Sequence, residues 1–184
     1  MGDTRESRVV GVARRSGHRF SKTPCWTIRL VAGLGVEGDG HFGDKVQHRS
    51  RAAKYPDMAN LRQIHLIHAE LFDELADRFG SLGSGDIGEN ILTRNIPLLA
   101  LPTGARLRIG AQAVVELTGL RNPCVQIDRF RPGLMAAMLG HDVAGELIRK
   151  AGVMGIVIVG GDVTVGDAVA VDLPDGELRP LAPV

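Results

Sequence analysis

The sequence predicts a mainly β protein, a barrel or a sandwich, and three observations favour this class over a helical bundle. Apolar and β-branched residues recur in short runs, and several runs alternate with polar residues as half-buried strands do. Twenty-four glycines and nine prolines divide the 184 residues into short segments. Hydrophobic residues make up 44% of the chain, enough for one core, so we expect a single domain over residues 1–184.

The predicted strands share a short apolar stretch that is bounded by glycine, proline or polar turns. In chain order they cover residues 9–13, 25–30, 61–67, 88–93, 105–110, 113–118, 153–159 and 165–171. Gly110 lies between two of them and predicts a hairpin, and the uncharged run 153–159 predicts a fully buried strand. The tail 174–184 is rich in proline and charge, so we expect it to be loosely held.

Three segments have helical character. Residues 69–79 place leucine, phenylalanine and alanine at helical spacing and end at Gly80, which predicts an amphipathic helix. A short helix is expected over 134–139. Another is expected over 143–150, with Lys150 near its C-terminal end, where the helix dipole favours a cation.

Composition argues against several classes of protein. A net charge of +1 argues against a general nucleic-acid binder. No apolar run approaches the ~20 residues that cross a bilayer, and the charged start does not resemble a signal peptide. We therefore expect a cytoplasmic protein without a nucleic-acid or membrane partner. Its two cysteines, Cys25 and Cys124, are too few for a disulfide framework.

Cys124 is the first candidate for chemistry. The strand at 113–118 leads to Arg121-Asn122-Pro123-Cys124, where proline ends the strand and makes the turn stiff. A nearby guanidinium favours the thiolate form of cysteine, so Arg121 is either an activator or a clamp for an anionic ligand. These residues alone leave two interpretations of Cys124, a reactive thiolate or a small buried hydrophobic residue. Cys25, beside the single tryptophan, is interpreted as a packing residue.

A glycine-rich stretch at 33–44 contains Asp39 and His41 but matches no phosphate-loop pattern. Asp39 is typical of turn residues that bond to their own backbone, whereas the role of His41 stays open. His65 and His68 flank a strand–helix junction, and as metal ligands they lack an evident third partner.

A basic stretch follows the glycine-rich one and contains His48, Arg49 and Arg51. Such a short charge run is either a solvated loop or an anion clamp, because planar guanidinium groups bind phosphate in a bidentate manner. The sequence leaves the roles of these three residues open.

Five short stretches, considered together, resemble the MOSC family, which is named for the C-terminal domain of molybdenum-cofactor sulfurase. They are Gly38-Asp39-Gly40-His41-Phe42-Gly43, Gly88-Glu89-Asn90-Ile91, Gly104-Ala105-Arg106-Leu107-Arg108-Ile109-Gly110, Arg121-Asn122-Pro123-Cys124, and residues 155–167. Their order and spacing cover about residues 30–172. The resemblance implies a closed, mostly antiparallel β-barrel with several peripheral helices.

The resemblance also implies roles for particular residues. In the family's enzymes that reduce N-hydroxylated compounds, the cysteine that matches Cys124 binds the molybdenum of a pterin cofactor. Carried over to this sequence, Asn90 and Arg121 are implied to bind the anionic pterin, with Thr118 close by. Asn122 and His41 join this cofactor-binding set. His41 or Asp128 is a candidate proton relay, and the alternative role of Asp128 is a cap for the turn to Phe130.

The leading hypothesis is therefore a molybdenum-cofactor oxidoreductase that reduces N-hydroxylated or N-oxygenated small molecules. The sequence lacks the N-terminal barrel and the fused reductase of larger relatives, so a separate electron-donor protein is expected. Two alternatives remain open, a persulfide on Cys124 that donates sulfur and a non-catalytic module that binds or delivers the cofactor. The sequence does not indicate an oligomeric state.

Overall fold

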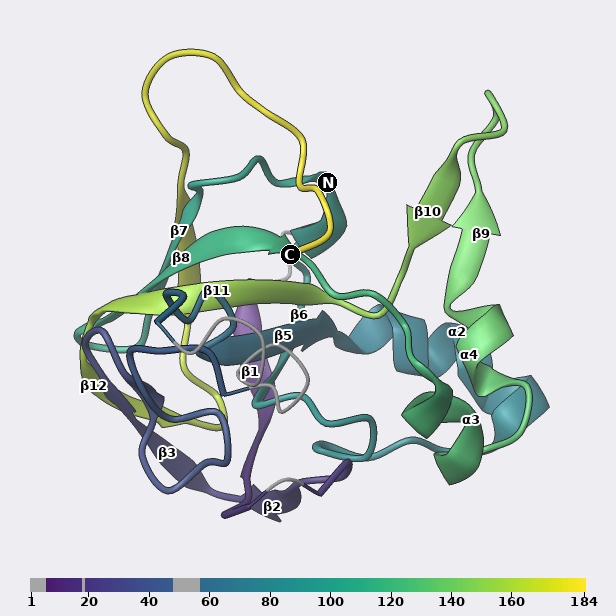
Figure 1. Cartoon of the computed structure of the whole chain (residues 1–184), viewed down its shortest axis with the longest axis horizontal. Coiled ribbons are helices and arrows are strands. Elements are labelled where there is room, and N and C mark those ends of the chain that lie inside the picture. The colour runs from purple at the N-terminus through teal and green to yellow at the C-terminus, as the bar shows by residue number, and fades with distance from the viewer. Residues whose placement is uncertain (1–5, 18, 48–56) are drawn as a thin grey trace.

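The computed structural model describes residues 6–17, 19–47 and 57–184, and strands form most of its regular structure (Figure 1). The strands in the first half are β1 (Arg8–Arg14), β2 (Thr23–Cys25), β3 (Thr27–Val31), β4 (Gly35–Val36), β5 (Ile64–His68) and β6 (Ile91–Arg94). Those in the second half are β7 (Arg106–Ile109), β8 (Ala113–Leu120), β9 (Leu139–His141), β10 (Leu147–Arg149), β11 (Val153–Val159), β12 (Gly161–Thr164) and β13 (Val169–Asp172). The helices are α2 (Ala69–Phe79), η1 (Leu98–Ala100), α3 (Val125–Phe130) and α4 (Leu134–Ala137).

Within the described residues, eight strands form one sheet in the order β13-β7-β8-β11-β5-β6-β1-β2, and β12-β3-β4 form a second sheet. The mainly β class is confirmed, but the prediction of a closed barrel is wrong. The large sheet is open, because β13 pairs only with β7 and β2 only with β1. An isolated β-bridge joins Arg8 of β1 to Ala168, the residue before β13, but β1 and β13 do not form a strand pair that would close the sheet.

The large sheet is also mixed. Its pairs are antiparallel except for β5 and β6, which run parallel. Parallel neighbours need a crossover connection, and α2 lies in the chain between these two strands. The periodicity of the sequence shows which residues form strands, but it contains no information about which edges would have to pair for closure.

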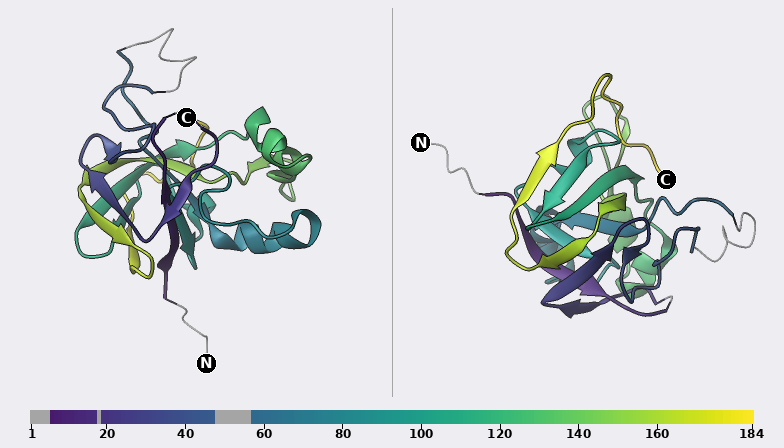
Figure 2. Two further views of the ribbon diagram at one scale, coloured as in Figure 1. Left: turned by 90° about the horizontal axis from the view of Figure 1, so that it is seen from below. Right: turned by 90° about the vertical axis from the view of Figure 1, so that its left-hand side faces the viewer.

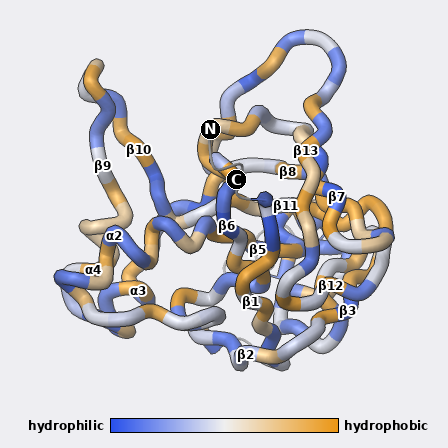
Figure 3. Tube along the Cα trace, turned by 180° about the vertical axis from the view of Figure 1, so that it is seen from behind, coloured by the Kyte–Doolittle hydropathy of each residue, from blue (hydrophilic) through white to orange (hydrophobic). Residues whose placement is uncertain are grey.

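Side-chain alternation places the main core between the two sheets. Along β8, Ala113, Val115 and Leu117 are buried while Glu116 and Thr118 are partly exposed. Figure 3 shows that hydrophobic and hydrophilic stretches follow one another along the chain. The buried side chains of β8 pack with those of β3, β5, β7 and β11 in one cluster.

A second hydrophobic cluster joins the helices to the sheet. Leu71, Phe72 and Leu75 of α2 pack in it with Ile127 of α3 and Leu134 of α4. Figure 2 shows the three helices gathered on one side of the sheet. The predicted helix over 69–79 is confirmed to the residue. Among the described helices, none has the length and hydropathy to span a membrane.

The helix predicted over 143–150 is wrong, because this segment belongs to the β9–β10 hairpin. The backbone N–H groups of Ala144 and Glu146 both donate to Asp142 Oδ1 at 2.8 Å, and Gly145 has a φ of 84°. These bonds form a turn in place of a helix. Figure 1 shows the hairpin extending away from the sheet beside α4.

Two further expectations need correction near the C-terminus. The strand expected over 165–171 is observed only over Val169–Asp172, as β13, while the preceding residues 161–164 form β12 and pair with β3. The tail is not loosely held over 179–184, because Thr103 N–H donates to Arg179 O and Leu120 N–H donates to Ala182 O, each at 2.8 Å. Leu181 is buried in the main core.

We predict that Gly152→Ala destabilises the fold strongly. Gly152 has a φ of 90°, and a Cβ atom there would lie 2.6 Å from Ile67 Cγ1 and 2.9 Å from His65 Nε2, and even closer to the Leu66 carbonyl oxygen. Backbone strain costs about 1–3 kcal/mol, and the clash adds to it. Gly145→Ala is the matched control, since its φ is 84° but no atom lies within 4 Å.

Urea unfolding of the two variants separates strain from crowding. Gly145→Ala should lower the free energy of unfolding by about 1–2 kcal/mol, and Gly152→Ala by clearly more or to the point of preventing folding. Equal effects in the two variants would contradict the close packing at Gly152.

Candidate functional site

One cavity of about 130 Å³ collects most of the residues that the sequence singled out. His41, Asn90, Arg121, Asn122 and Cys124 all line it. They come from the loop after β4, from the residue before β6, and from the segment between β8 and α3. These five residues therefore share one cavity, while their roles stay predictions.

Two other predicted residues lie outside the cavity, and one further group falls outside the described part of the chain. Thr118 does not line the cavity, and its hydroxyl donates to Leu61 O at 2.6 Å. Asp128 Oδ1 accepts a hydrogen bond from Met135 N–H at 2.7 Å and so joins α3 to α4. His48, Arg49 and Arg51 lie outside the described residues.

The cavity lining is basic. Among the described residues that line it, four carry a cationic side chain and none carries a carboxylate. The four are Arg19, Lys22, Arg62 and Arg121. Lys22 is paired with the buried carboxylate of Asp39, so the three arginines are the side chains that favour an anionic ligand. Unlike charges attract more strongly where water is partly excluded.

Cys124 is the residue immediately before α3 and has an extended backbone, with φ −133° and ψ 164°. Its carbonyl accepts a hydrogen bond from Ile127 N–H at 2.9 Å, which begins the helix. The residue is partly exposed, and its Sγ lies 3.7 Å from Gln126 Oε1. The thiol is therefore open to the cavity, and the interpretation of Cys124 as a sealed core residue does not hold.

Arg121 is held rigidly beside this thiol. Its backbone N–H donates to Gly152 O at 3.0 Å, and its Nη1 donates to Ile87 O at 2.7 Å. The guanidinium lies over the Phe20 ring at 5.7 Å. Burial lowers the pKa of Arg121, while nearby Cys124 and Glu89 act in the opposite direction. The side chain thus brings a fixed positive charge to the cavity wall.

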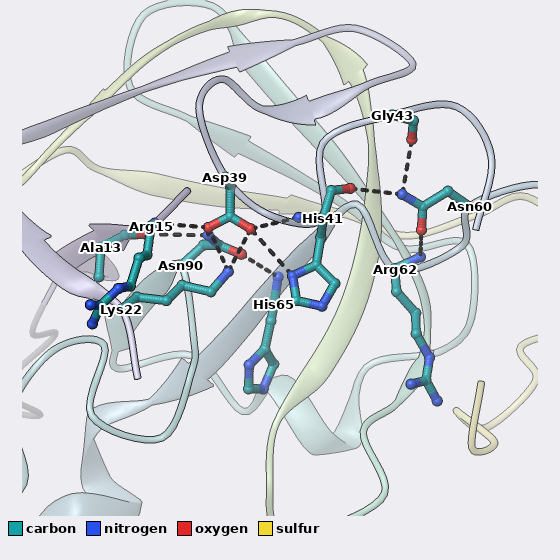
Figure 4. Close-up of polar contacts among 10 residues, drawn as sticks. All are labelled: Ala13, Arg15, Lys22, Asp39, His41, Gly43, Asn60, Arg62, His65 and Asn90. Atoms are coloured by element: carbon teal, nitrogen blue, oxygen red, sulfur yellow. Dashed lines mark hydrogen bonds and ion pairs between the residues drawn. The ribbon is translucent and has the colours of Figure 1, made fainter. Parts of the chain in front are cut away.

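Asp39 organises the part of the cavity wall that His41, Lys22 and Asn90 form (Figure 4). Its carboxylate is fully buried and accepts hydrogen bonds from Lys22 Nζ at 2.8 and 2.9 Å and from Arg15 N–H at 3.3 Å. His41 adds its backbone N–H at 3.1 Å and its ring Nδ1 at 3.3 Å, both to Oδ1. Burial alone would raise the pKa of Asp39, but His41 and Lys22 hold it well below its usual range.

Asn90 completes this network. Its Nδ2 donates to Asp39 Oδ2 at 3.0 Å and to Ala13 O at 3.2 Å, and its Oδ1 accepts from His65 N–H at 3.2 Å. Both amide protons are therefore used within the protein. This geometry favours Asn90 as a residue that shapes the cavity rather than as a donor to a ligand.

Two buried titratable groups lie close to these walls. Burial, reinforced by the charge of Arg121, lowers the pKa of His65 far below its ordinary value, and His65 Nε2 donates to Ala151 O at 2.8 Å. Burial raises the pKa of Glu89 to about 7. Glu89 Oε1 accepts from Gly85 N–H, while its other oxygen has no hydrogen-bond partner in the described part of the chain.

Sequence reasoning missed Lys22, Asn60 and Arg62 as cavity residues. Asn60 donates to His41 O and Gly43 O at 2.9 Å, and its Oδ1 accepts from Arg62 N–H at 3.0 Å. It therefore ties the glycine-rich loop to the start of β5. Lys22 is 17 residues from Asp39 in the sequence, and no local pattern signals that the two side chains pair. His65 and His68 form no metal centre, since the described residues contain no cluster of three possible ligands.

We predict that Asp39→Asn destabilises the protein by about 3–5 kcal/mol, because it leaves the buried Lys22 charge without its partner. The double variant Lys22→Met/Asp39→Asn should recover part of this loss. In the wild type, Asp39 has a lowered pKa, so its contribution is present above pH ~4 and is lost as the pH falls further.

Urea unfolding at several pH values measures these effects. Asp57→Asn is the control, because its ion pair with Lys45 is exposed and should contribute little. An Asp39→Asn variant as stable as the control would show that the buried pair does not support the fold.

Comparison with known proteins agrees with this geometry. A sequence model of the MOSC domain matches residues 37–170. The YuaD protein of Bacillus subtilis shares the fold with a TM-score of 0.73 at 23% identity, over 91% of this chain and 96% of that one. YiiM of Geobacillus stearothermophilus gives 0.65 at 18% identity, over 95% and 79%. YiiM of Escherichia coli gives 0.61 at 18% identity, over 94% and 73%.

At these levels of identity, the solved structures support the fold alone. A sequence search of curated proteins returned no match. The matched residues 37–170 include the glycine-rich loop and Asn90, and they continue through Arg121 and Cys124. The match covers most of the sequence, and the chain therefore belongs to the MOSC domain family.

Proposed function

We propose that the cavity binds a molybdenum–pterin cofactor through Cys124 and that the protein reduces N-hydroxylated small molecules. The observation that carries this proposal is a partly exposed thiol in a cavity whose described lining has four cationic side chains and no carboxylate. Membership of the MOSC family supports the same cofactor.

The residues present fit such a group in their chemistry. Thiolate is a soft ligand of the kind that transition metals with sulfur-rich coordination accept. The guanidinium of Arg121 suits the anionic parts of the cofactor, because charged donors form strong hydrogen bonds to phosphate. The described residues enclose about 130 Å³, below the roughly 300–1,000 Å³ of typical ligand sites. The cavity would therefore surround the metal end of the cofactor and leave the remainder at its mouth.

In this proposal the cofactor supplies two-electron chemistry, and the protein supplies binding, orientation and control of water. Cys124 would bind the metal, and Arg121 would hold an anionic part of the pterin. Asn90 and Asp39 hold the wall that contains His41 and Lys22 in place through their shared hydrogen bond. The reducing equivalents come from a separate electron-donor protein.

Cys124→Ser is predicted to lose the metal. The protein is purified from cells that make the cofactor, and molybdenum and pterin are measured per chain. We expect near-stoichiometric metal in the wild type and at least a tenfold loss in Cys124→Ser, because a hydroxyl is a harder and weaker ligand than a thiolate. Cys25→Ser is the matched control. Cys25 packs against the main core, so this variant should keep the metal.

Three results would redirect the proposal. Equal metal content in both cysteine variants would remove Cys124 as the ligand. Cyanide-labile sulfur on Cys124 without molybdenum would indicate a sulfur carrier. Metal without reduction of phenylhydroxylamine by reduced methyl viologen would indicate a binding or delivery module.

Arg121→Lys is predicted to weaken cofactor retention about 10- to 100-fold, because lysine lacks the planar pair of donors that guanidinium offers to an anion. Arg129→Lys is the control, since Arg129 is an exposed residue of α3 that does not line the cavity. Retention is measured as pterin remaining after dialysis. Equal retention in both variants would show that Arg121 does not bind the cofactor.

A further inference from the structure

We propose that His41, oriented by Asp39, donates the proton that converts the departing oxygen to water when the N–O bond of the substrate breaks. This inference rests on the proposed function and names a residue that carries out part of its chemistry. It follows from the position of His41 in the cavity and from the contacts that hold its ring.

The chemistry requires such a donor. Reduction of R–NHOH to R–NH₂ breaks the N–O bond and takes up two electrons and two protons. One proton joins the oxygen, which leaves as water, and the other joins the nitrogen. The electrons come from the donor protein, or in the assay from reduced methyl viologen. Hydroxide is a poor leaving group, so a positioned acid accelerates the step.

Few described residues that line the cavity can supply this proton. Arginine is too basic to release one under these conditions. Lys22 is buried in its ion pair with Asp39, and burial holds His65 in the neutral form. Cys124 is deprotonated when it binds a metal. His41 remains, and its side chain is 40% exposed.

The contacts of His41 define which nitrogen acts. Asp39 stays ionised, so its Oδ1 can only accept, and the Nδ1 that lies 3.3 Å away carries a proton. Nε2 is then the nitrogen that exchanges a proton with a substrate, as in other histidines oriented by a carboxylate. The backbone of His41 is fixed from both sides, by its N–H bond to Asp39 and by the Asn60 Nδ2 bond to its carbonyl. Figure 4 shows the ring beside the Asp39 carboxylate.

The test compares His41→Gln with His141→Gln in the cofactor-loaded protein. Glutamine can still donate to Asp39 but has no proton to transfer, and His141 lies on the exposed β9–β10 hairpin outside the cavity. Turnover of phenylhydroxylamine with reduced methyl viologen should fall about 100-fold or more in kcat for His41→Gln, with little change in KM. Added imidazole should restore part of the rate, and molybdenum content should match the wild type.

A second readout needs no activity. In ¹⁵N-histidine spectra of the metal-free protein, the His41 signal, assigned by its loss in His41→Gln, should show a protonated Nδ1 in the neutral ring. A protonated Nε2 would overturn the assigned orientation. Unchanged kcat in His41→Gln, with an active wild type, would overturn the proton-donor role alone. An inactive but metal-loaded wild type would overturn both this role and the proposed reduction.

Discussion

The buried carboxylate of Asp39 is the group on which the geometry of the site depends. A buried carboxylate must be surrounded by hydrogen-bond donors, because its desolvation would otherwise destabilise the fold strongly. Asp39 obtains one set of donors from His41 in its own loop and the others from three residues that are distant in the sequence, Arg15, Lys22 and Asn90. The same hydrogen bonds bring the end of β1, the approach to β2, the glycine-rich loop and the start of β6 together. One wall of the cavity is therefore a consequence of solvating a single buried anion.

The part of the cavity that contains Arg121 and Cys124 is held by the sheet instead of by a charge. β8 delivers Arg121 to its position, and Gly152 at the start of β11 accepts the Arg121 N–H. On its other side, the end of β8 is bonded by the C-terminal tail at Ala182. Arg149 Nε of β10 donates to Asn122 Oδ1 at 2.7 Å and so holds the segment that leads to Cys124. The thiol thus follows a strand end that is fixed on both edges, although the loop itself has only one turn-forming proline.

Local patterns predicted those parts of the fold that local interactions determine. The spacing of Leu71, Phe72 and Leu75 was enough to place α2, and the alternation in 113–118 was enough to place β8. The helix prediction for 143–150 was wrong because its helix-forming residues compete with a turn, in which Asp142 accepts hydrogen bonds from two backbone N–H groups. The open sheet and the attached tail could not be predicted from local sequence patterns, since both depend on hydrogen bonds between backbone groups that are distant in the sequence.

The candidate site divides in the same way. Cys124, Arg121 and Asn122 are adjacent in the sequence, so a single motif identified them together. Lys22, Asn60 and Arg62 reach the cavity only through the fold. Asp39 was interpreted as a turn residue, and it does accept the N–H of His41 two residues later at 3.1 Å. The sequence could not show that the same carboxylate also forms an ion pair with Lys22, which immediately precedes β2.

The charge balance behind the cavity follows from these contacts. Asp39 is ionised and offsets Lys22, so this pair adds no net charge to the wall. Arg121 has Glu89 as its nearby acidic group, and burial raises the pKa of Glu89 to about 7. Below pH 7, Glu89 is mostly protonated and leaves the Arg121 charge available to a ligand. Above pH 7, ionised Glu89 competes for that charge. Glu89 thus modulates the positive charge that Arg121 offers to the cavity, although Glu89 does not itself line it.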